Sequence, residues 1–310
     1  MPGPRILRLA VRGKRHPCPF STCGHPEEAE VFQACLSPHP AADHCVHSLL
    51  ARLLAGLAVW IAAAATAAHA GDLGTDRDAF TPSSHLIEPG TLLQEGSWVY
   101  IDNRTGLPTN NVPEYLLRVG AAEWLEWRFG VNYGVNAQGN VVTSVEVGEG
   151  RFDGLALYDA AILYGFKAAG TTQDGLIPES CFIMEASTPT SGDVWGTVPV
   201  ATLVAGWELP GEWRFDTSLR YSYAEWETGW FSRWAPTAIL RMPITERWEI
   251  HAEWFETITQ GLPIDSVRPY FSPGTHYLVT ENLEVGLRVG WGLDDEAAPF
   301  FSDVGFGWRW

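Results

Sequence analysis

Four side chains in the second half of the chain have types and spacing that could do chemistry. His251 lies between Glu249 and Glu253 in a segment of alternating pattern, so these three side chains share one face. His276 lies on the polar face of the next such segment. Imidazole and carboxylate groups arranged in this way could bind a metal ion. Solvated polar side chains beside carboxylates have the same spacing, however, so we expect no metal.

The same histidines could serve a hydrolase, which needs a serine, a histidine and an orienting polar group within hydrogen-bond reach. The sequence has no Gly-x-Ser-x-Gly elbow, no His-Glu-x-x-His pair, no phosphate-binding loop and no convincing dinucleotide-binding fingerprint. Cys181, the single cysteine after residue 70, has no evident activating partner and is expected to be a small wall residue. We therefore expect no enzymatic activity and no cofactor. A hydrolase with a serine close to His251 or His276 is kept as an alternative.

The elements that would position these groups follow a period of two residues over most of the chain. In one example, Trp127, Phe129 and Val131 alternate with Glu126 and Arg128. Segments of about ten residues, apolar on one face and charged or small on the other, are typical of transmembrane β-barrels. A soluble β-sandwich also alternates, but the aromatic residues near the segment ends favour lipid–water interfaces.

This pattern predicts an all-β fold, an antiparallel transmembrane β-barrel of about twelve strands. An even number of strands places both termini on the periplasmic side. Short connections such as 122–123, 209–212 and 242–247 are expected to be periplasmic turns, and longer ones such as 135–154 are expected to be external loops. The expected strands are 92–101, 113–121, 124–134, 155–168, 177–188, 197–208, 213–223, 230–241, 248–258, 267–278, 283–293 and 301–310.

The charged side chains of these strands fall on the face that a barrel turns towards its lumen. An arginine on the lipid face near the midplane would cost roughly 2–4 kcal/mol, which fixes the register of the strands. Basic and acidic residues on the inner face are nearly balanced. They could set the solute preference of a pore, or they could pair across strands and fill a narrow barrel. The residues expected to line the lumen are Glu114, Arg118, Glu126, Arg128, Lys167, Arg214, Asp216, Arg220, Arg241, Glu249, His251, Glu253, Glu284, Arg288, Asp303 and Arg309.

The last expected strand carries bulky apolar residues at alternate positions and ends in an aromatic residue. It resembles the terminal strand that the barrel-assembly machinery of outer membranes recognises, which implies this machinery as a partner. The expected recognition residues are Val304, Phe306, Trp308 and Trp310. Closure of the barrel would also cover an aromatic edge that otherwise invites aggregation.

Several short stretches resemble the phenol meta-degradation pathway family of bacterial outer-membrane β-barrel transporters. The resemblance spans residues 75–310 and implies a barrel that transports aromatic compounds. It offers no catalytic residues. The stretches that carry it are 114–120, 124–130, 189–192, 244–248, 277–283 and 290–293.

Residues 48–70 have the pattern of a cleavable signal peptide, because an apolar run ends in the small residues Ala68-His69-Ala70. The run also approaches the roughly 20 residues of a membrane span, so an uncleaved anchor is the alternative. After cleavage the chain would begin near Gly71. We expect a periplasmic lead segment at 71–91 and the barrel at 92–310.

Residues 1–47 precede this signal and are expected to be a non-structural or mis-started extension. A zinc site built from their four cysteines and the nearby His25, His39 or His44 is the alternative. The spacing lacks the tight pairs of ligands found in standard zinc fingers, which disfavours zinc. These cysteines are Cys18, Cys23, Cys35 and Cys45.

The composition excludes one broad class of partner. The chain has 20 Lys and Arg against 37 Asp and Glu, a net charge of −17, which argues against binding nucleic acid. Residues 71–310 carry 14 basic and 33 acidic residues. The acidic excess falls mostly in the lead segment and the connections. There it could solubilise the rim of the barrel or bind divalent cations at lipid headgroups.

Together these patterns favour an outer-membrane barrel, monomeric or oligomeric, that lets small solutes diffuse passively through a charge-lined lumen. The resemblance implies that these solutes are aromatic. Its expected partners are outer-membrane lipid and a small-molecule solute. A non-conducting structural or adhesion barrel with acidic external loops is the main alternative, and an outer-membrane hydrolase is the less favoured one.

Overall fold

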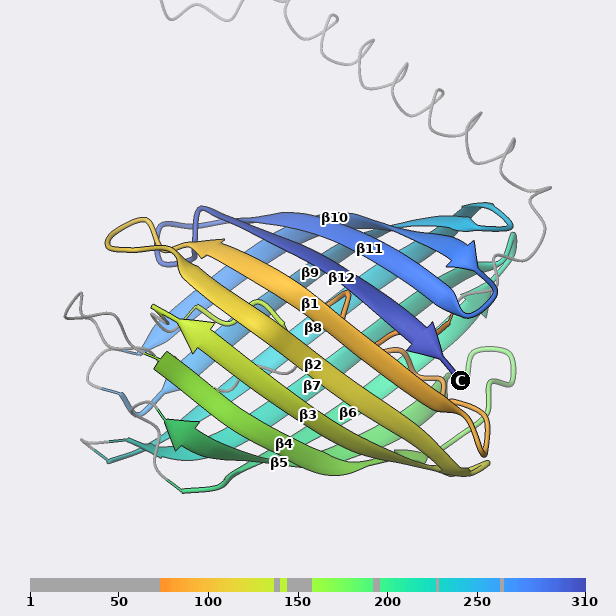
Figure 1. Cartoon of the computed structure of the whole chain (residues 1–310), viewed down its shortest axis with the longest axis horizontal. Helices are drawn as coiled ribbons and strands as arrows, with labels where there is room; N and C mark the ends of the chain where they lie inside the picture. Colours follow the sequence, from red (N-terminus) through yellow and green to blue (C-terminus); the bar gives the residue numbers. More distant parts are fainter. Residues whose placement is uncertain (1–72, 137–139, 144–157, 192–195, 227–228, 263–264) are drawn as a thin grey trace, which may run out of the picture. The chain divides into compact units, whose positions relative to one another are not determined.

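The computed structural model of the chain describes residues 73–136, 140–143, 158–191, 196–226, 229–262 and 265–310. These residues form twelve antiparallel strands that close into a barrel. Each strand pairs with its neighbours in the sequence, and β1 pairs with β12 to complete the ring (Figure 1). No helix in this part of the chain is long and apolar enough to cross a membrane.

The predicted fold class and strand number are confirmed, and the expected strand ends lie within four residues of the observed ones. The strands are β1 (Leu92–Asp102), β2 (Thr109–Ala122), β3 (Leu125–Val135), β4 (Tyr158–Ala169), β5 (Glu179–Ser191), β6 (Val198–Leu209), β7 (Trp213–Trp226), β8 (Gly229–Thr245), β9 (Trp248–Gln260), β10 (Ser266–Thr280), β11 (Leu283–Gly292) and β12 (Phe300–Arg309).

The two largest boundary errors both lie at prolines. β2 begins four residues earlier than expected and contains Pro113, and β8 continues through Pro243, so that the expected turn 242–247 shortens to 246–247. Proline has no N–H to give to a neighbouring strand, and it is tolerated in a sheet mainly at edges and bulges. The strand register shifts between Asn111 and Glu114 and again between Pro243 and Thr245. These irregularities accommodate the prolines without ending the strands.

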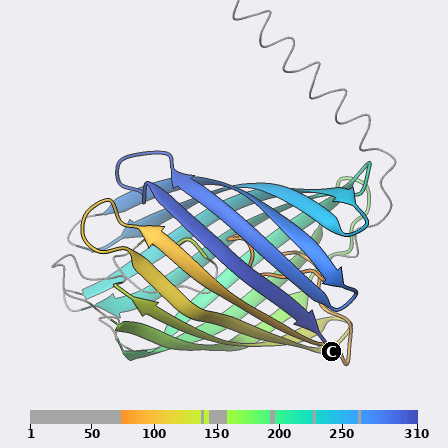
Figure 2. The same cartoon turned by 45° about the horizontal axis from the view of Figure 1, so that its top comes forward.

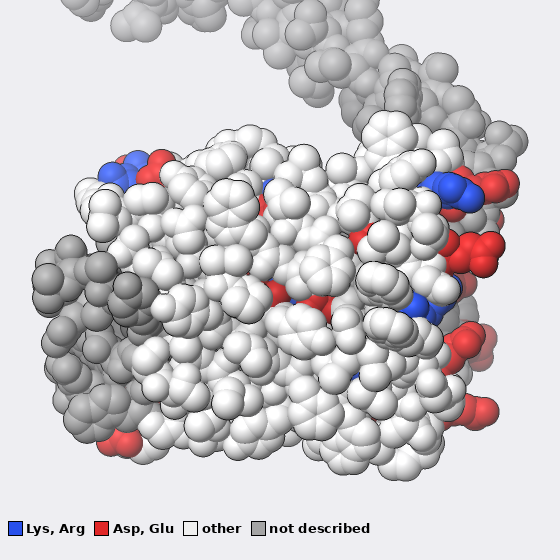
Figure 3. Space-filling view, in the orientation of Figure 1, with Lys and Arg blue, Asp and Glu red and all other residues white. Residues whose placement is uncertain are grey.

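Alternation places apolar side chains on the outer face of the barrel. Trp127, Phe129 and Val131 of β3 are each more than 40% exposed, whereas Glu126 and Arg128 between them are buried. In Figure 3 the visible outer face is mostly uncharged along the middle of the barrel. The Asp, Glu, Lys and Arg residues on this face lie mainly at its ends. An apolar band of this kind is what a lipid bilayer requires of a spanning barrel.

The connections differ between the two ends of the barrel. Residues 123–124, 210–212, 246–247 and 281–282 make short connections at the end where the C-terminus lies, which we call the termini end (Figure 1). The connections at 103–108 and 293–299 lie at the opposite end, the long-loop end, and are longer, although residues 170–178 make one longer connection at the termini end.

The lead segment does not lie outside the barrel as the sequence suggested. Residues 73–86 run inside it, visible between the strands as an orange trace in Figure 2. Their polar groups contact side chains of β1, β2, β3, β4, β7 and β9, strands from around the whole barrel. We call residues 73–86 the inner segment. From the long-loop end, residues 140–143 also enter: Val141, Val142 and Thr143 are buried.

The inner face is not polar throughout. Phe255, Tyr270 and Phe301 point inwards and pack with Phe80 of the inner segment and with the buried Val142. This apolar cluster corrects the expectation that the strands are aromatic only outside. It arises because β9, β10 and β12 each carry one inward-facing aromatic residue next to a polar inner position, as Phe255 beside Glu253 shows.

Candidate functional site

The candidate site is the interior of the barrel, where the structure places the charged residues expected in a lumen. Two of them, Glu249 and Arg309, are only half-buried, and Arg309 bonds to the Glu281 carbonyl at the rim of the termini end. The others have less than a tenth of their surface exposed: Glu114, Arg118, Glu126, Arg128, Lys167, Arg214, Asp216, Arg220, Arg241, His251, Glu253, Glu284, Arg288 and Asp303.

The first anchor of the inner segment is Asp76, which lies among three cations of the barrel wall. Its Oδ2 lies 2.6 Å from Arg128 Nη1, 3.2 Å from Lys167 Nζ and 3.5 Å from Arg118 Nη1. The two arginines are themselves paired with wall carboxylates: both Nε and Nη2 of Arg118 donate to Glu126, at 2.7 and 2.8 Å, and Arg128 Nε donates to Glu185 at 2.7 Å. Charge-assisted and bidentate bonds of this kind are among the strongest hydrogen bonds in proteins.

These cations set the ionisation of Asp76. Burial alone would raise the pKa of its carboxyl group, but the charges of Arg118, Lys167 and Arg128 outweigh burial and hold the pKa well below its usual value of 3.8. Asp76 is therefore an anion at every physiological pH. An anion without these partners would be costly to bury, so the carboxylate depends on the wall for its place inside the barrel.

The second anchor is Glu253 of β9, which binds the backbone of the inner segment. Its Oε1 accepts hydrogen bonds from the Thr81 N–H at 2.6 Å and the Thr81 hydroxyl at 2.7 Å, and its Oε2 accepts one from the Phe80 N–H at 3.1 Å. Arg288 Nη1 lies 3.0 Å from the same Oε2. One wall carboxylate thus satisfies three donors of the inner segment and one cation.

The third anchor joins residues 81–85 to β5, β7 and β8. Asp216 accepts from the Ser84 N–H at 3.2 Å and pairs with Arg214 at 3.0 Å and Arg241 at 2.7 Å. Arg241 also donates to the Thr81 carbonyl oxygen at 3.3 Å. His85, at the exit towards the termini end, lies 2.7 Å from Glu179 and also contacts Arg214. The inner segment is thus held by charged and polar contacts along most of its length.

Between the second and third anchors, Phe80 forms an aromatic contact inside the barrel. Its ring stacks on Phe255 with 4.7 Å between centroids and an interplanar angle of 17°. Phe255 in turn stacks on Tyr270 at 4.8 Å. The guanidinium of Arg220 lies over the Phe80 ring, 5.8 Å from its centroid, in cation–π geometry. Phe80 therefore occupies a slot built for one flat aromatic ring.

Cavities remain at both ends of the filled interior. At the termini end a cavity of about 500 Å³ is lined by residues of the inner segment, such as Leu73 and His85, and by Arg118, Arg214 and Arg309 of the wall. At the long-loop end a cavity of about 410 Å³ is lined partly by the acidic residues Asp265, Asp294, Asp295 and Glu296. The inner segment and residues 140–143 lie in the interior of the same barrel.

The two histidines lie close together, as expected from adjacent strands. The His251 and His276 ring centroids are 5.0 Å apart, and Asp78 of the inner segment joins them, with Oδ2 2.5 Å from His276 Nε2. His276 Nδ1 lies 3.2 Å from Glu284. Among the described residues neither histidine has a hydrogen bond to a serine, so the arrangement that the alternative hydrolase needs is not formed here.

Sequence reasoning missed the functional residues of the inner segment, above all Asp76, Asp78, Phe80 and Thr81. It also missed Glu95, whose Oε2 accepts the N–H groups of residues 76 and 77 at 2.9 Å. The available clue was the cluster of charges at 76–78, ahead of a series of strands whose inner faces carry many cations. The residues expected to guide barrel assembly, Val304, Phe306, Trp308 and Trp310, are all exposed on the outer face of the last strand or just beyond it.

Comparison with known proteins supports the fold. No protein-family model matches the sequence, and no curated protein is significantly similar to it. Among solved structures, an outer-membrane channel from Pseudomonas putida F1 has a TM-score of 0.53 and 9% identity, over 74% of this chain and 98% of that one. The KdgM porin has a TM-score of 0.46 and 8% identity, over 70% and 98% of the two chains. The closed barrel and the similarity to the Pseudomonas channel show that the chain has the fold of bacterial outer-membrane β-barrels. Its resemblance to the phenol meta-degradation family stays a prediction.

Proposed function

We propose that the protein is an outer-membrane channel for small solutes, in which the inner segment closes the passage. The observation that carries this proposal is the way the segment is held. Asp76, Thr81 and Ser84 contact the wall through ion pairs and hydrogen bonds, which water can replace when the segment leaves. Buried ion pairs add little net stability, because desolvation offsets most of their attraction. In the open barrel, water would hydrate the wall charges that the departing segment leaves behind, which lowers the net cost of opening.

In this proposal the apolar outer face contacts outer-membrane lipid, and the termini end faces the periplasm. Residues 48–70 act as the export signal, and β12 with Trp310 presents the signal for the barrel-assembly machinery. The termini end suits the periplasmic side because four of its connections are short. The inner segment then enters the lumen from the periplasmic end, and it can leave through the same end without crossing the barrel wall.

We further propose that the solutes are small aromatic molecules. The Phe80 ring lies between the Phe255 ring and the Arg220 guanidinium. When the inner segment withdraws, it uncovers a surface that binds flat rings by stacking and cation–π contacts. Arg220 lies beside this surface and would favour an aromatic carboxylate over a neutral ring. The chemistry agrees with the transport of aromatic compounds implied by the sequence resemblance.

The proposal is tested by flux into liposomes that contain the purified protein. We expect benzoate to enter faster than cyclohexanecarboxylate, which matches it in charge and size but has no aromatic ring. Replacing Arg220 with Gln should reduce this difference. Equal entry of the two solutes would reject the aromatic preference, and no entry of either from variants that release the inner segment would reject the channel.

A non-conducting barrel is the second candidate function, and the filled interior favours it. The inner segment and residues 140–143 both lie in the barrel, and Arg288 bonds to both Glu253 and the Val142 carbonyl oxygen. In a structural barrel these contacts would be permanent. Release of the inner segment would then destabilise the barrel, and heat-modifiability on a denaturing gel would be lost together with the closed state.

A further inference from the structure

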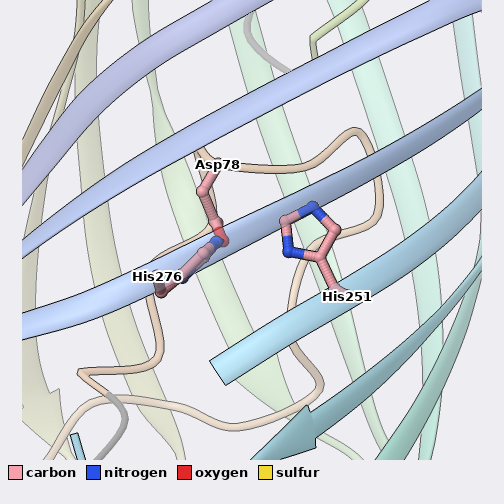
Figure 4. A group of neighbouring side chains, drawn as sticks. All are labelled: Asp78, His251 and His276. Carbon is pink, nitrogen blue, oxygen red and sulfur yellow. The ribbon is translucent and has the colours of Figure 1, made fainter. Parts of the chain in front are cut away.

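Three side chains from separate parts of the backbone converge inside the barrel near the inner segment. Asp78 comes from the inner segment, His251 from β9 and His276 from β10, and Figure 4 shows all three pointing towards one another. One ligand atom from each, a carboxylate oxygen or an imidazole nitrogen, lies within 4.8 Å of the other two. Two imidazoles and one carboxylate form a donor set typical of divalent transition-metal ions.

His251 supplies an independent reason to place a ligand here. The side chain is buried, and among the described residues neither of its ring nitrogens has a hydrogen-bond partner. A buried polar group left unsatisfied costs about 1–3 kcal/mol, and such groups in native proteins usually bond to water or an ion. The ring faces Asp78 and His276, so the missing partner lies among these three residues.

The wall is shaped to hold the His251 ring in this position. Gly274 of β10 is the direct cross-strand partner of His251, and the ring lies over it. A Cβ atom at position 274 would overlap His251 Nε2. The ring can therefore lie against β10, beside His276, only because residue 274 is glycine.

The surroundings also suit a cation. His276 Nδ1 lies 3.2 Å from Glu284 Oε1, which leaves Nε2 directed at Asp78. A carboxylate bonded to the second nitrogen of a metal-binding histidine fixes the ring and raises its affinity for the metal. The two nearby arginines have anionic partners of their own: Arg241 pairs with Asp216 at 2.7 Å and Arg288 with Glu253 at 3.0 Å.

We propose that Asp78, His251 and His276 bind a divalent transition-metal ion of the zinc class and that this ion ties the inner segment to the barrel wall. Tetrahedral bonds of about 2.0–2.2 Å place ligand atoms roughly 3.3 Å apart. Binding would thus lengthen the 2.5 Å contact between Asp78 and His276 and draw in His251. Three protein ligands leave one position for water. Because Asp78 belongs to the inner segment, the ion adds a fourth anchor to the three described above.

The test uses the full-length protein in detergent, freed of metal by chelation and titrated with Zn²⁺ by calorimetry and with Co²⁺ by absorption. We compare wild type with Asp78→Asn, His251→Ala and Gly274→Ala. The last variant keeps all three ligands but displaces the His251 ring. Glu246→Gln is the control, because Glu246 is an exposed carboxylate in the turn between β8 and β9 and belongs to none of the anchors. Heat-modifiability on a gel confirms that each variant is folded.

We expect a binding event with one ion per chain that is present in wild type and Glu246→Gln and lost in Asp78→Asn, His251→Ala and Gly274→Ala. Glu284→Gln should weaken it by about 10- to 100-fold. The Co²⁺ spectrum of this event should lack thiolate charge-transfer bands, which separates it from binding by the cysteines before residue 48. Binding that is unchanged in folded Asp78→Asn and His251→Ala, or absent from wild type, would overturn the proposal and leave water as the partner of His251.

Discussion

Replacement of Glu253 by Gln tests whether the inner segment is held by the contacts described. The carboxylate of Glu253 accepts three hydrogen bonds from Phe80 and Thr81 and pairs with Arg288. Glutamine has nearly the same shape but keeps only one acceptor oxygen, and its NH₂ group would face a donor of the inner segment or of Arg288. The substitution therefore removes a charge and places donor against donor without removing volume.

The size of the effect follows from these contacts. Hydrogen bonds to a charged group contribute about 1.5–3 kcal/mol each, and an unpaired buried partner adds to the loss. We take about 3 kcal/mol as the net cost to the closed state, because some bonds reform through the remaining oxygen and through water. At 1.4 kcal/mol per factor of ten, the open population should rise about 100-fold.

The assay is the open probability of single proteins in planar bilayers, measured beside the accessibility of the inner segment to protease. Glu246→Gln is the control, because Glu246 is exposed in the turn between β8 and β9. We expect both readouts to increase strongly in Glu253→Gln and not in the control. If folded Glu253→Gln opens no more often than wild type and remains equally protected, the reasoning about this anchor is refuted.

Asp76→Asn should also favour release of the inner segment. It should destabilise the closed state by about 3 kcal/mol, because it leaves three buried cations short of an anion. Since the folded pKa of Asp76 lies below its unfolded value, its contribution is complete above pH 3.8 and is lost only as pH falls through the folded pKa. The difference in protease protection between wild type and Asp76→Asn should therefore be equal at pH 7 and pH 5, and a difference that shrinks by pH 5 would contradict this. Phe80→Ala should empty the aromatic slot and weaken the closed state by about 3 kcal/mol; benzoate should then protect the barrel against thermal unfolding more than cyclohexanecarboxylate does, and equal protection would count against the slot.

The sequence predicted the barrel well because the physical constraint on each strand is local. Lipid outside and charges inside impose a two-residue period, so Glu126 and Arg128 had to face away from Trp127 and Phe129. Prolines misled the prediction at β2 and β8, since the bulges that tolerate them depend on neighbouring strands. Adjacent strands also placed His251 near His276.

The inner segment could not be predicted in the same way. Asp76, Arg77 and Asp78 have the charge pattern of a solvated linker, and no periodicity marks a chain that lies inside a barrel without pairing as a strand. Its burial depends on partners from strands as distant in sequence as β9, whose Glu253 is 172 residues from Thr81. Such long-range contacts form only once the barrel has closed. The same is true of the slot of Phe80 and of the position of Asp78, the third proposed metal ligand.

The measurement that tests the central claim most directly is flux through a barrel whose inner segment is locked in place. Cys181 is buried against the inner segment, with its Sγ 3.9 Å from the Ser83 carbonyl oxygen, so Ser83→Cys introduces a second thiol beside it. We expect the oxidised variant, with the 83–181 disulfide verified by mass spectrometry, to conduct no solute, and we expect the reduced form to regain flux. Equal flux through the locked and the reduced barrel would show that the inner segment does not close the passage.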